Sequence, residues 1–344
     1  MSAPSVPDTF TVHTDETEDV HIHGGHHAKL RQQTIELPGD EPLWIARTTL
    51  PDGPTRPKVI LIHGFAQNRF SWHTEYRSMA GWLAERGWDV WNLELRGHGR
   101  SRRRGGSKTT QFSDYPADLN RLADAMETPA FWIGHSLGAS VAYAACAARP
   151  DSPATAGVIG IGGLYRFGQA GWVLPTVCRI TNQLPGSLNL GDIQVHTGGT
   201  GRLLAKLFPL VDLAAYGMPI AGWWPGSVEP ELAKERMKRG FDFIPVRVWQ
   251  EMASWGEADA VPWDQGWRET QAPCLIIVGD RDSMLFPKEG KAAYERSGTT
   301  DKTFKLFDDR DGLTHWGHLD LVLGKQAPDH VWSLVEAWMG ERIQ

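Results

Sequence analysis

The sequence predicts an α/β protein whose mostly parallel, doubly wound sheet is covered by helices on both faces. Two observations carry this prediction. Short apolar strands alternate with amphipathic helices over residues 58–161 and again over 273–339. Between them, residues 164–266 are rich in Gly, Pro and Trp and contain no strong strand pattern. We therefore expect one α/β core that is interrupted by an inserted, mainly helical cap.

The core elements follow in order from local periodicity. The predicted helix over 71–86, for example, places Trp72, Tyr76, Met79 and Leu83 on one face. The predicted strands cover residues 58–62, 88–95, 130–134, 156–161, 273–278 and 302–307. The predicted core helices cover 71–86, 115–126, 137–148, 288–296 and 329–339, and two shorter ones fall within the insertion at 203–213 and 230–239.

The N-terminal region has a different composition. Residues 1–30 are polar and include five histidines, which is typical of a flexible tail, with a metal-binding tract as the alternative. Residues 32–50 contain two strand-like runs around Pro38-Gly39-Asp40, a pattern that predicts a hairpin. The expected domains are a tail at 1–30, an α/β core at 31–163 and 267–344, and a cap at 164–266.

Composition excludes several classes of protein. The net charge of −6 gives no general electrostatic support for nucleic-acid binding. The three cysteines, Cys146, Cys178 and Cys274, are far apart and odd in number, so no disulfide framework or metal knuckle is predicted. The N-terminus has no apolar signal segment, and no run reaches the ~18 apolar residues that span a bilayer. We expect no integral membrane segment and a cytoplasmic location.

The strongest chemical signal is Gly134-His135-Ser136-Leu137-Gly138, which fits G-x-S-x-G between a predicted strand and a predicted helix. A sharp strand-to-helix turn needs glycines, and it exposes the serine hydroxyl at the positive end of the helix. Ser136 is therefore a candidate nucleophile. The alternative is a serine that only caps the helix between structural glycines.

A serine nucleophile needs a base, and the base needs an acid to orient it. In this architecture the acid follows a late strand and the histidine comes after the last one. Two aspartates, Asp280 and Asp282, follow the 273–278 strand. Two histidines, His315 and His318, follow the 302–307 strand. Position along the chain alone leaves both choices open.

An oxyanion hole is the third expected part, because two backbone N–H groups must face the oxygen that becomes negative. We expect one from Leu137, directly after the serine. The other should come from Phe65 in His63-Gly64-Phe65-Ala66, where Gly64 lets the backbone approach closely. A plain turn at the end of a strand is the alternative for that segment.

Five segments together resemble the α/β-hydrolase superfamily, in its order and near its usual spacings. They are LIHGFAQN (61–68), LRGHGRS (95–101), GHSLG (134–138), IVGDRDSMLFP (277–287) and GHLDLVLG (317–324). The details resemble the lipase and esterase branch. The resemblance implies the α/β-hydrolase fold and a catalytic triad of Ser136 as nucleophile, Asp282 as acid and His318 as base.

Two positions refine this resemblance. Relatives often have Asp-x-Arg before Gly-His-Gly, whereas this chain has Glu94-Leu95-Arg96, which puts the chemistry of that loop in doubt but not the triad. Haloalkane dehalogenases and epoxide hydrolases share the fold but use an aspartate at the turn. Ser136 therefore argues against both activities.

The insertion resembles the cap of these hydrolases and would cover the nucleophile. Its tryptophans suit an apolar pocket, although most could form the cap's own core. His135, Trp223 and Trp224 are the candidate pocket residues. The predicted function is a serine hydrolase acting on a small-molecule carboxylic ester with an apolar acyl or alcohol part, without a metal or organic cofactor. The alternatives are another acyl-transfer enzyme (thioesterase, amidase, C–C hydrolase or acyltransferase) or a ligand receptor with slow turnover.

Overall fold

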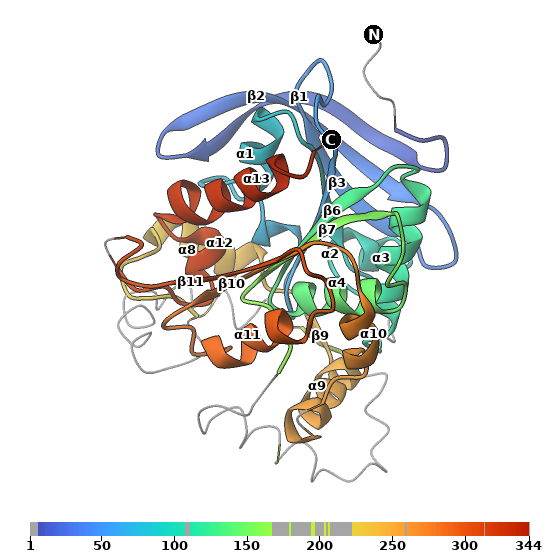
Figure 1. Ribbon diagram of the computed structural model, residues 1–344. Helices are drawn as coiled ribbons and strands as arrows, with labels where there is room; N and C mark the ends of the chain where they lie inside the picture. Colours follow the sequence, from blue (N-terminus) through green and yellow to red (C-terminus); the bar gives the residue numbers. More distant parts are fainter. Residues whose placement is uncertain are drawn as a thin grey trace.

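The computed structural model describes residues 6–106, 111–166, 222–258, 260–312 and 314–343, together with Arg179, 194–196, Leu203 and Lys206. The described strands form a nine-stranded sheet in the order β1-β2-β3-β5-β4-β6-β7-β10-β11 (Figure 1). Its strands are β1 Thr11–His23, β2 His26–Leu37, β3 Leu43–Thr49, β4 Lys58–Ile62, β5 Asp89–Glu94, β6 Ala130–His135, β7 Thr155–Ile161, β10 Cys274–Gly279 and β11 Lys302–Phe307.

Neighbouring strands in the part of the sheet ordered β5-β4-β6-β7-β10-β11 are parallel. Neighbouring strands in the part ordered β1-β2-β3-β5 are antiparallel. The predicted α/β class is therefore confirmed. The helices are α1 Met79–Glu85, α2 Gly99–Arg103, α3 Asp114–Ala125, α4 Leu137–Ala147, α8 Pro230–Arg239, α9 Val246–Ala258, α10 Asp264–Glu269, α11 Pro287–Arg296, α12 Asp320–Leu323 and α13 Ser333–Gly340. A π-helical turn at Pro328–Trp332 leads into α13.

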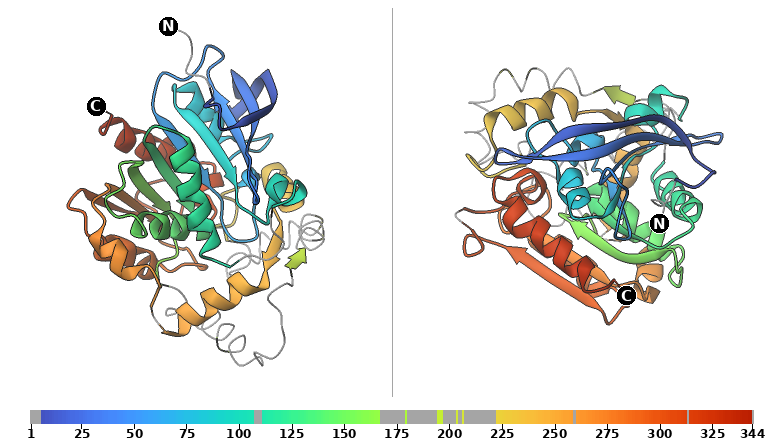
Figure 2. Two further views of the ribbon diagram at one scale, coloured as in Figure 1. Left: turned by 90° about the vertical axis from the view of Figure 1, so that its right-hand side faces the viewer. Right: turned by 90° about the horizontal axis from the view of Figure 1, so that it is seen from above.

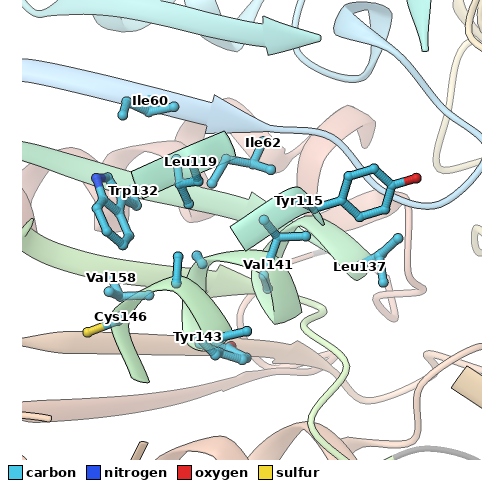
Figure 3. Packing of buried hydrophobic residues seen from close by; sticks show 14 of the residues in the cluster. Ile60, Ile62, Tyr115, Leu119, Trp132, Leu137, Val141, Tyr143, Cys146 and Val158 are labelled. Atoms are coloured by element: carbon cyan, nitrogen blue, oxygen red, sulfur yellow. The ribbon is translucent and has the colours of Figure 1, made fainter. Parts of the chain in front are cut away.

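Alternate side chains of the central strands enter separate cores on the two faces of the sheet, as the strand period of two requires. Ile60 and Ile62 of β4 pack on one face with residues of α3, α4, α10 and α11 (Figure 3). Val59 and Leu61 pack on the other face with residues of α1, α8, α12 and α13. Both faces are thus covered, which is why the strands read as continuous apolar runs.

The N-terminal region differs from its prediction. Residues predicted as a flexible tail form the long β1–β2 hairpin, which lies over α1 (Figure 2). Val20, Ile22 and Leu30 are buried in the core on the α1 side, and the Ser78 backbone N–H donates to the Ile22 carbonyl at 2.9 Å. A few apolar residues are enough to fix this polar hairpin on the protein, because β1 pairs with β2 and β2 pairs with β3. Composition alone could not reveal that pairing.

The predicted helix over 71–86 is shorter than expected. Only Met79–Glu85 is α-helical, beginning after Ser78, whose hydroxyl accepts a hydrogen bond from the Gly81 N–H at 2.8 Å. Before it, Thr74 forms a turn in which its hydroxyl accepts from the Arg77 N–H at 2.9 Å. Tyr76, predicted to share the buried face, is exposed. A side-chain cap therefore decided the boundary against the apolar spacing.

The insertion is only partly described. The predicted helix at 230–239 is confirmed as α8, while the one predicted at 203–213 lies outside the described residues except for Leu203 and Lys206. Two short strands that the sequence did not predict, β8 Gln194–His196 and β9 Phe243–Pro245, pair in antiparallel fashion. The core resumes a little before residue 267, because α10 packs on α4 and buries Trp267. No helix in the described ranges is long and apolar enough to cross a membrane.

Candidate active site

Three residues predicted to act together lie on loops at the carboxyl edge of the parallel strands. Ser136 follows β6, Asp282 lies in the loop after β10, and His318 lies in the loop between β11 and α12. In doubly wound sheets this edge is where ligands bind. The sheet therefore brings together residues far apart in the chain, such as His135 and His318, which are 183 positions apart and in contact.

Ser136 has the strained backbone that the sequence pattern predicts. Its φ is 56° and its ψ is −123°, an uncommon conformation for a residue with a side chain. The flanking glycines are required by space. A Cβ on Gly134 would come within 2.3 Å of the Ala139 nitrogen, and one on Gly138 within 2.2 Å of the Ile62 carbonyl oxygen. The turn places Ser136, 7% exposed, at the N-terminus of α4.

His318 and Asp282 form a buried pair. The His318 Nδ1 lies 2.7 Å from the Asp282 Oδ2, and the side chains are 1% and 0% exposed. The other carboxylate oxygen, Oδ1, accepts from the N–H groups of Met284 at 2.9 Å and Leu285 at 2.8 Å. The carboxylate is thus fixed from both sides. It holds the imidazole with Nε2 available.

The His318 Nε2 is buried and has no hydrogen-bond partner among the described residues. The Ser136–His318 hydrogen bond expected of a triad is thus not formed in this conformation. Such bonds are often long without substrate and shorten in the complex. Behind the ring, Gly162 has a φ of +54°, and a Cβ there would lie 3.1 Å from the His318 Nδ1. Gly162 therefore leaves the space that the His318–Asp282 pair occupies.

His135 is buried beside His318 and is not among the residues that line the apolar cavity described below. It was a candidate pocket residue, but its buried ring packs against His318, with ring centroids 4.6 Å apart, and against Trp72. Its Nε2 lies 3.1 Å from the His318 carbonyl oxygen. Burial, followed by the neighbouring His318, lowers the pKa of His135 well below its usual range. A neutral His135 can donate this hydrogen bond from its Nε2 and so help to fix the backbone at His318.

The two N–H groups predicted to form an oxyanion hole are free to bind an anion. Neither the Phe65 N–H nor the Leu137 N–H has a hydrogen-bond partner within the described part of the chain. For Leu137 this follows from its place at the first position of α4. Gly64 allows the loop after β4 to approach Ser136 closely, because a Cβ at this position would lie only 3.1 Å from the Ser136 Cβ.

An apolar cavity of about 300 Å³ lies beside these loops. Phe65 from one loop, Met284 from the Asp282 loop and Leu319 after His318 all line it, so it borders three of the loops that carry the candidate residues. Ser136 itself is not among the lining residues. Trp223 lines the cavity together with side chains of α8, whereas Trp224 does not line it.

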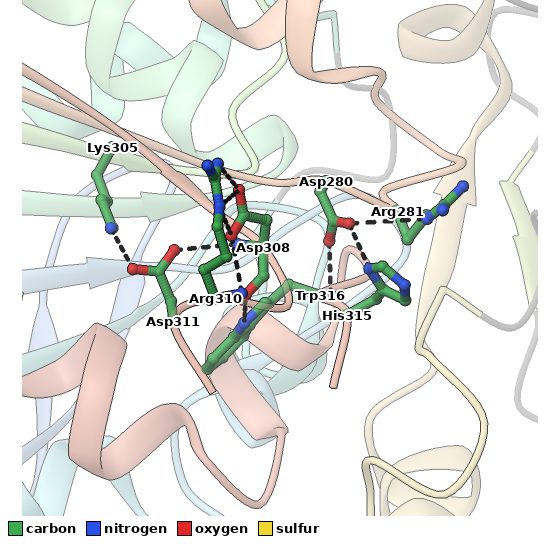
Figure 4. Close-up of polar contacts among 8 residues, drawn as sticks. All are labelled: Asp280, Arg281, Lys305, Asp308, Arg310, Asp311, His315 and Trp316. Atoms are coloured by element: carbon green, nitrogen blue, oxygen red, sulfur yellow. Dashed lines mark hydrogen bonds and ion pairs between the residues drawn. The ribbon is translucent and has the colours of Figure 1, made fainter. Parts of the chain in front are cut away.

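Trp224 instead contacts the histidine of a second histidine–aspartate pair. Its ring contacts that of His315 with centroids 4.7 Å apart. The His315 Nδ1 lies 2.6 Å from the Asp280 Oδ2, and Asp280 also accepts from the Trp316 N–H at 2.9 Å (Figure 4). The two aspartates and two histidines left open by chain position therefore form two separate pairs.

Asp320 is a site residue whose role local pattern did not indicate beyond a helix start. Its buried Oδ2 accepts from the N–H groups of Trp224 at 2.7 Å and Gly317 at 2.6 Å, and its Oδ1 accepts from the Ser227 hydroxyl. Burial raises the pKa of Asp320 to about 7. The carboxyl group thus ties the chain that returns from the insertion to the loop that carries His318. Its place two residues after His318, in the Gly-His-Leu-Asp segment, was the available signal.

The loop that departs from the family pattern is also held by ion pairs. Glu94 accepts from Arg69 at 3.0 Å and from the Arg100 N–H at 3.0 Å. Arg96 binds Asp118 through two hydrogen bonds of 2.7 Å. The longer glutamate side chain is therefore accommodated as a structural anchor. Within the described residues, no group of three or more His, Cys, Asp or Glu side chains is arranged to hold a metal ion.

Comparisons with known proteins agree with this architecture. A family described as serine aminopeptidase, S33, matches residues 53–203. Epoxide hydrolase B of Mycobacterium tuberculosis is 32% identical over 152 residues, 43% of this chain and 38% of that protein. The pimeloyl-[acyl-carrier protein] methyl ester esterase of Methylococcus capsulatus is 31% identical over 101 residues, 29% of this chain and 35% of that protein. The chain thus matches well under half the length of these curated relatives.

The likeness of folds extends much further along the chain. The structure of Paleococcus ferrophilus monoacylglycerol lipase superposes with a TM-score of 0.61 at 17% identity, over 88% of this chain and 99% of that one. At this sequence identity the match shows a shared fold and does not show a shared function. With its sheet order, its strained serine turn and this structural likeness, the chain has the α/β-hydrolase fold.

Proposed function

We propose that this protein is a serine hydrolase that cleaves carboxylic esters with an apolar acyl or alcohol part. The observation that carries the proposal is the strained turn at Ser136, with the buried His318–Asp282 pair on a neighbouring loop. The two unpaired N–H groups of Phe65 and Leu137 and the apolar cavity support it.

In the proposed reaction, the Ser136 Oγ attacks the ester carbonyl carbon while the His318 Nε2 takes the hydroxyl proton. The negative oxygen of the tetrahedral intermediate accepts hydrogen bonds from the Phe65 and Leu137 N–H groups. His318 then gives its proton to the departing alkoxide, which leaves as an alcohol, and an acyl-enzyme remains. Asp282 holds the imidazole and stabilises its charged form.

Water completes the cycle. His318 takes a proton from the attacking water, the hydroxide adds to the acyl carbon, and the carboxylic acid leaves as Ser136 recovers its proton. No metal or organic cofactor takes part in this proposal. The His318 Nε2, which would take the proton, has no competing partner within the described residues.

The curated relatives point to two chemistries, and the turn residue separates them. The similarity to epoxide hydrolase B would suggest epoxide opening, which in that family uses an aspartate at the turn. This chain has Ser136 there. The similarity to a methyl ester esterase agrees with a serine nucleophile and an ester substrate.

The test combines labelling with a substrate panel. A fluorophosphonate probe should label the purified protein but not its Ser136→Ala variant. Rates on p-nitrophenyl esters of increasing chain length should exceed those on acyl-CoA and amide substrates. Faster cleavage of acyl-CoA or amides would replace the ester assignment by another acyl-transfer activity. If neither labelling nor turnover occurred, the slow-turnover receptor would stand and the enzyme proposal would fail.

A further inference from the structure

Arg236 is the one charged residue that lines the mostly apolar cavity, where Gln67 is the other polar residue of the lining. It is in the last turn of α8 and is 6% exposed, and it lines the cavity together with Phe65, Leu319 and Met284. Its charge also acts on His63 and His135, the residues that precede Gly64 and Ser136. Arg236 therefore lies close enough to influence the two loops of the candidate catalytic site.

Arg236 has no compensating charge. It forms no ion pair and no hydrogen bond with any described residue, and its Nε and Nη1 are fully buried without a partner. Burial alone lowers its pKa to about 10, so the group stays protonated at neutral pH. The face of Phe241, 6.0 Å from the guanidinium carbon, offers only a weak cation–π contact. A buried unpaired guanidinium is costly, which calls for a compensating partner.

The surroundings hold Arg236 in place. Gly240 leaves room for it, since a Cβ there would lie 1.6 Å from the Nη1. Helix α8 is anchored on the loop after β4, where Asn68 donates to the Arg239 carbonyl oxygen at 2.9 Å. Glu235, on the preceding position, is engaged elsewhere and accepts from the Glu75 N–H at 2.9 Å. Glu235, the acid next to Arg236 in the sequence, thus has its own partners and does not pair with the guanidinium.

We propose that Arg236 binds an oxyanion at the far end of the substrate, so that the preferred ester carries a carboxylate or phosphate several carbons from the scissile carbonyl. The apolar walls would hold the connecting chain. A guanidinium suits this task because its planar fork pairs with either anion through two parallel hydrogen bonds. This inference rests on the proposed esterase function for its kinetic test but not for its binding test.

The kinetic test compares substrates that differ in one end group. Mono-p-nitrophenyl adipate and p-nitrophenyl hexanoate share the reactive ester and chain length, but only the first ends in a carboxylate. Wild-type kcat/KM should favour the adipate about 10- to 100-fold, as expected for a charge-assisted pair in a dry site. Arg236→Gln should abolish that preference, so that its ratio of kcat/KM for the adipate to kcat/KM for the hexanoate approaches one. Arg236→Lys should restore part of it.

The binding test uses Ser136→Ala protein, which cannot turn over the ligand. Calorimetry with monomethyl adipate, methyl hexanoate and methyl 6-(phosphonooxy)hexanoate should give tighter binding of the two anions than of the neutral ester. Whichever of the carboxylate and phosphate ligands binds more tightly identifies the preferred end group of the substrate. Adding Arg236→Gln should equalise all three.

The outcomes separate the two proposals. Ser136-dependent hydrolysis with no preference for the adipate would overturn the Arg236 inference and leave the esterase proposal standing. Selective anion binding without any hydrolysis would support the Arg236 site and sink the esterase proposal. If Arg236→Gln did not fold, the wild-type preference and the Arg236→Lys variant would still decide. Equal binding of all three ligands to Ser136→Ala protein would overturn the inference.

Discussion

The protein has two histidine–aspartate pairs that are alike in their hydrogen bond and differ in their burial. His318–Asp282 joins at 2.7 Å and His315–Asp280 at 2.6 Å, both through Nδ1. Their surroundings differ. The first pair is 1% and 0% exposed, whereas the second is 24% and 17% exposed. The length of the hydrogen bond therefore does not distinguish the buried candidate catalytic pair from the half-buried pair.

The difference lies in what surrounds each pair. The second oxygen of Asp282 is held by two backbone N–H groups, and His318 follows Gly317, whose backbone is tied to Asp320. Asp280 instead holds the Trp316 N–H and lies near Arg281, as Figure 4 shows. The buried pair is fixed with one imidazole nitrogen unused. The half-buried pair links the His315 loop to the end of β10.

The largest effect should come from His318→Ala. If the buried pair supplies the base, kcat/KM on a p-nitrophenyl ester should fall by about 10³-fold or more. The rate should be measured alongside thermal unfolding, so that loss of folding is separated from loss of chemistry. A folded variant that kept a tenth of the wild-type activity would reverse our assignment of the two pairs.

A smaller loss is expected when the space behind the buried pair is filled. Gly162→Ala adds a Cβ 3.1 Å from the His318 Nδ1 at a φ of +54°. We expect kcat to fall about tenfold, as for a misplaced catalytic group, with ~1–2 kcal/mol of lost stability from backbone strain.

Gly226→Ala is a matched control for that strain. Its φ is +75°, yet a Cβ there would meet nothing within 4 Å. It should lose similar stability but keep its activity, as measured by steady-state kinetics and denaturant unfolding. Equal losses of activity in both variants would show that strain, and not the position of His318, was responsible.

Asp320→Asn should change the pH dependence of stability more than activity. The pKa of Asp320 is raised from 3.8 in the unfolded chain to about 7 in the folded protein. Between these values the folded state holds more protons, so the stability that this group contributes falls as pH rises from 4 to 7. Asparagine lacks this titration. The variant should therefore gain in unfolding free energy relative to wild type by ~2–4 kcal/mol across that window.

The measurement is urea unfolding of both proteins at several pH values from 4 to 8. An unchanged difference across this range would contradict a raised pKa for Asp320. Asparagine can keep the bonds from the Trp224 and Gly317 N–H groups through its oxygen and donate to Ser227 through its amide. Because these hydrogen bonds are kept, kcat/KM at pH 7 should stay within about threefold of the wild-type value.

The smallest effect is expected for the half-buried His315–Asp280 pair. His315→Ala and Asp280→Asn remove a partly solvated contact and leave Asp282 and His318 in place. Each should cost at most ~1 kcal/mol of stability and change kcat/KM by less than about threefold. Unfolding and ester hydrolysis should be measured for both. A loss comparable with that of His318→Ala would show that the two pairs act together.

Much of the core could be predicted from the chain alone. Apolar runs and helix periodicity gave the order of β4, β5, β6, β7, β10 and β11 because burial on both faces leaves a local trace. The turn at Ser136 was also readable, since only glycine fits at positions 134 and 138. The β1–β2 hairpin was not, because most of its stabilisation comes from strand pairing and from contacts with α1.

Sequence by itself determined which residue types occupy the carboxyl edge of the sheet and in which order they arrive there. Tertiary structure decided which of them meet: Asp282 with His318, Asp280 with His315, and Arg236 with no charged partner among the described residues. The physical reason is that a turn depends on the conformations of adjacent residues. Burial, pairing and pKa depend on groups that the fold brings together from distant parts of the chain.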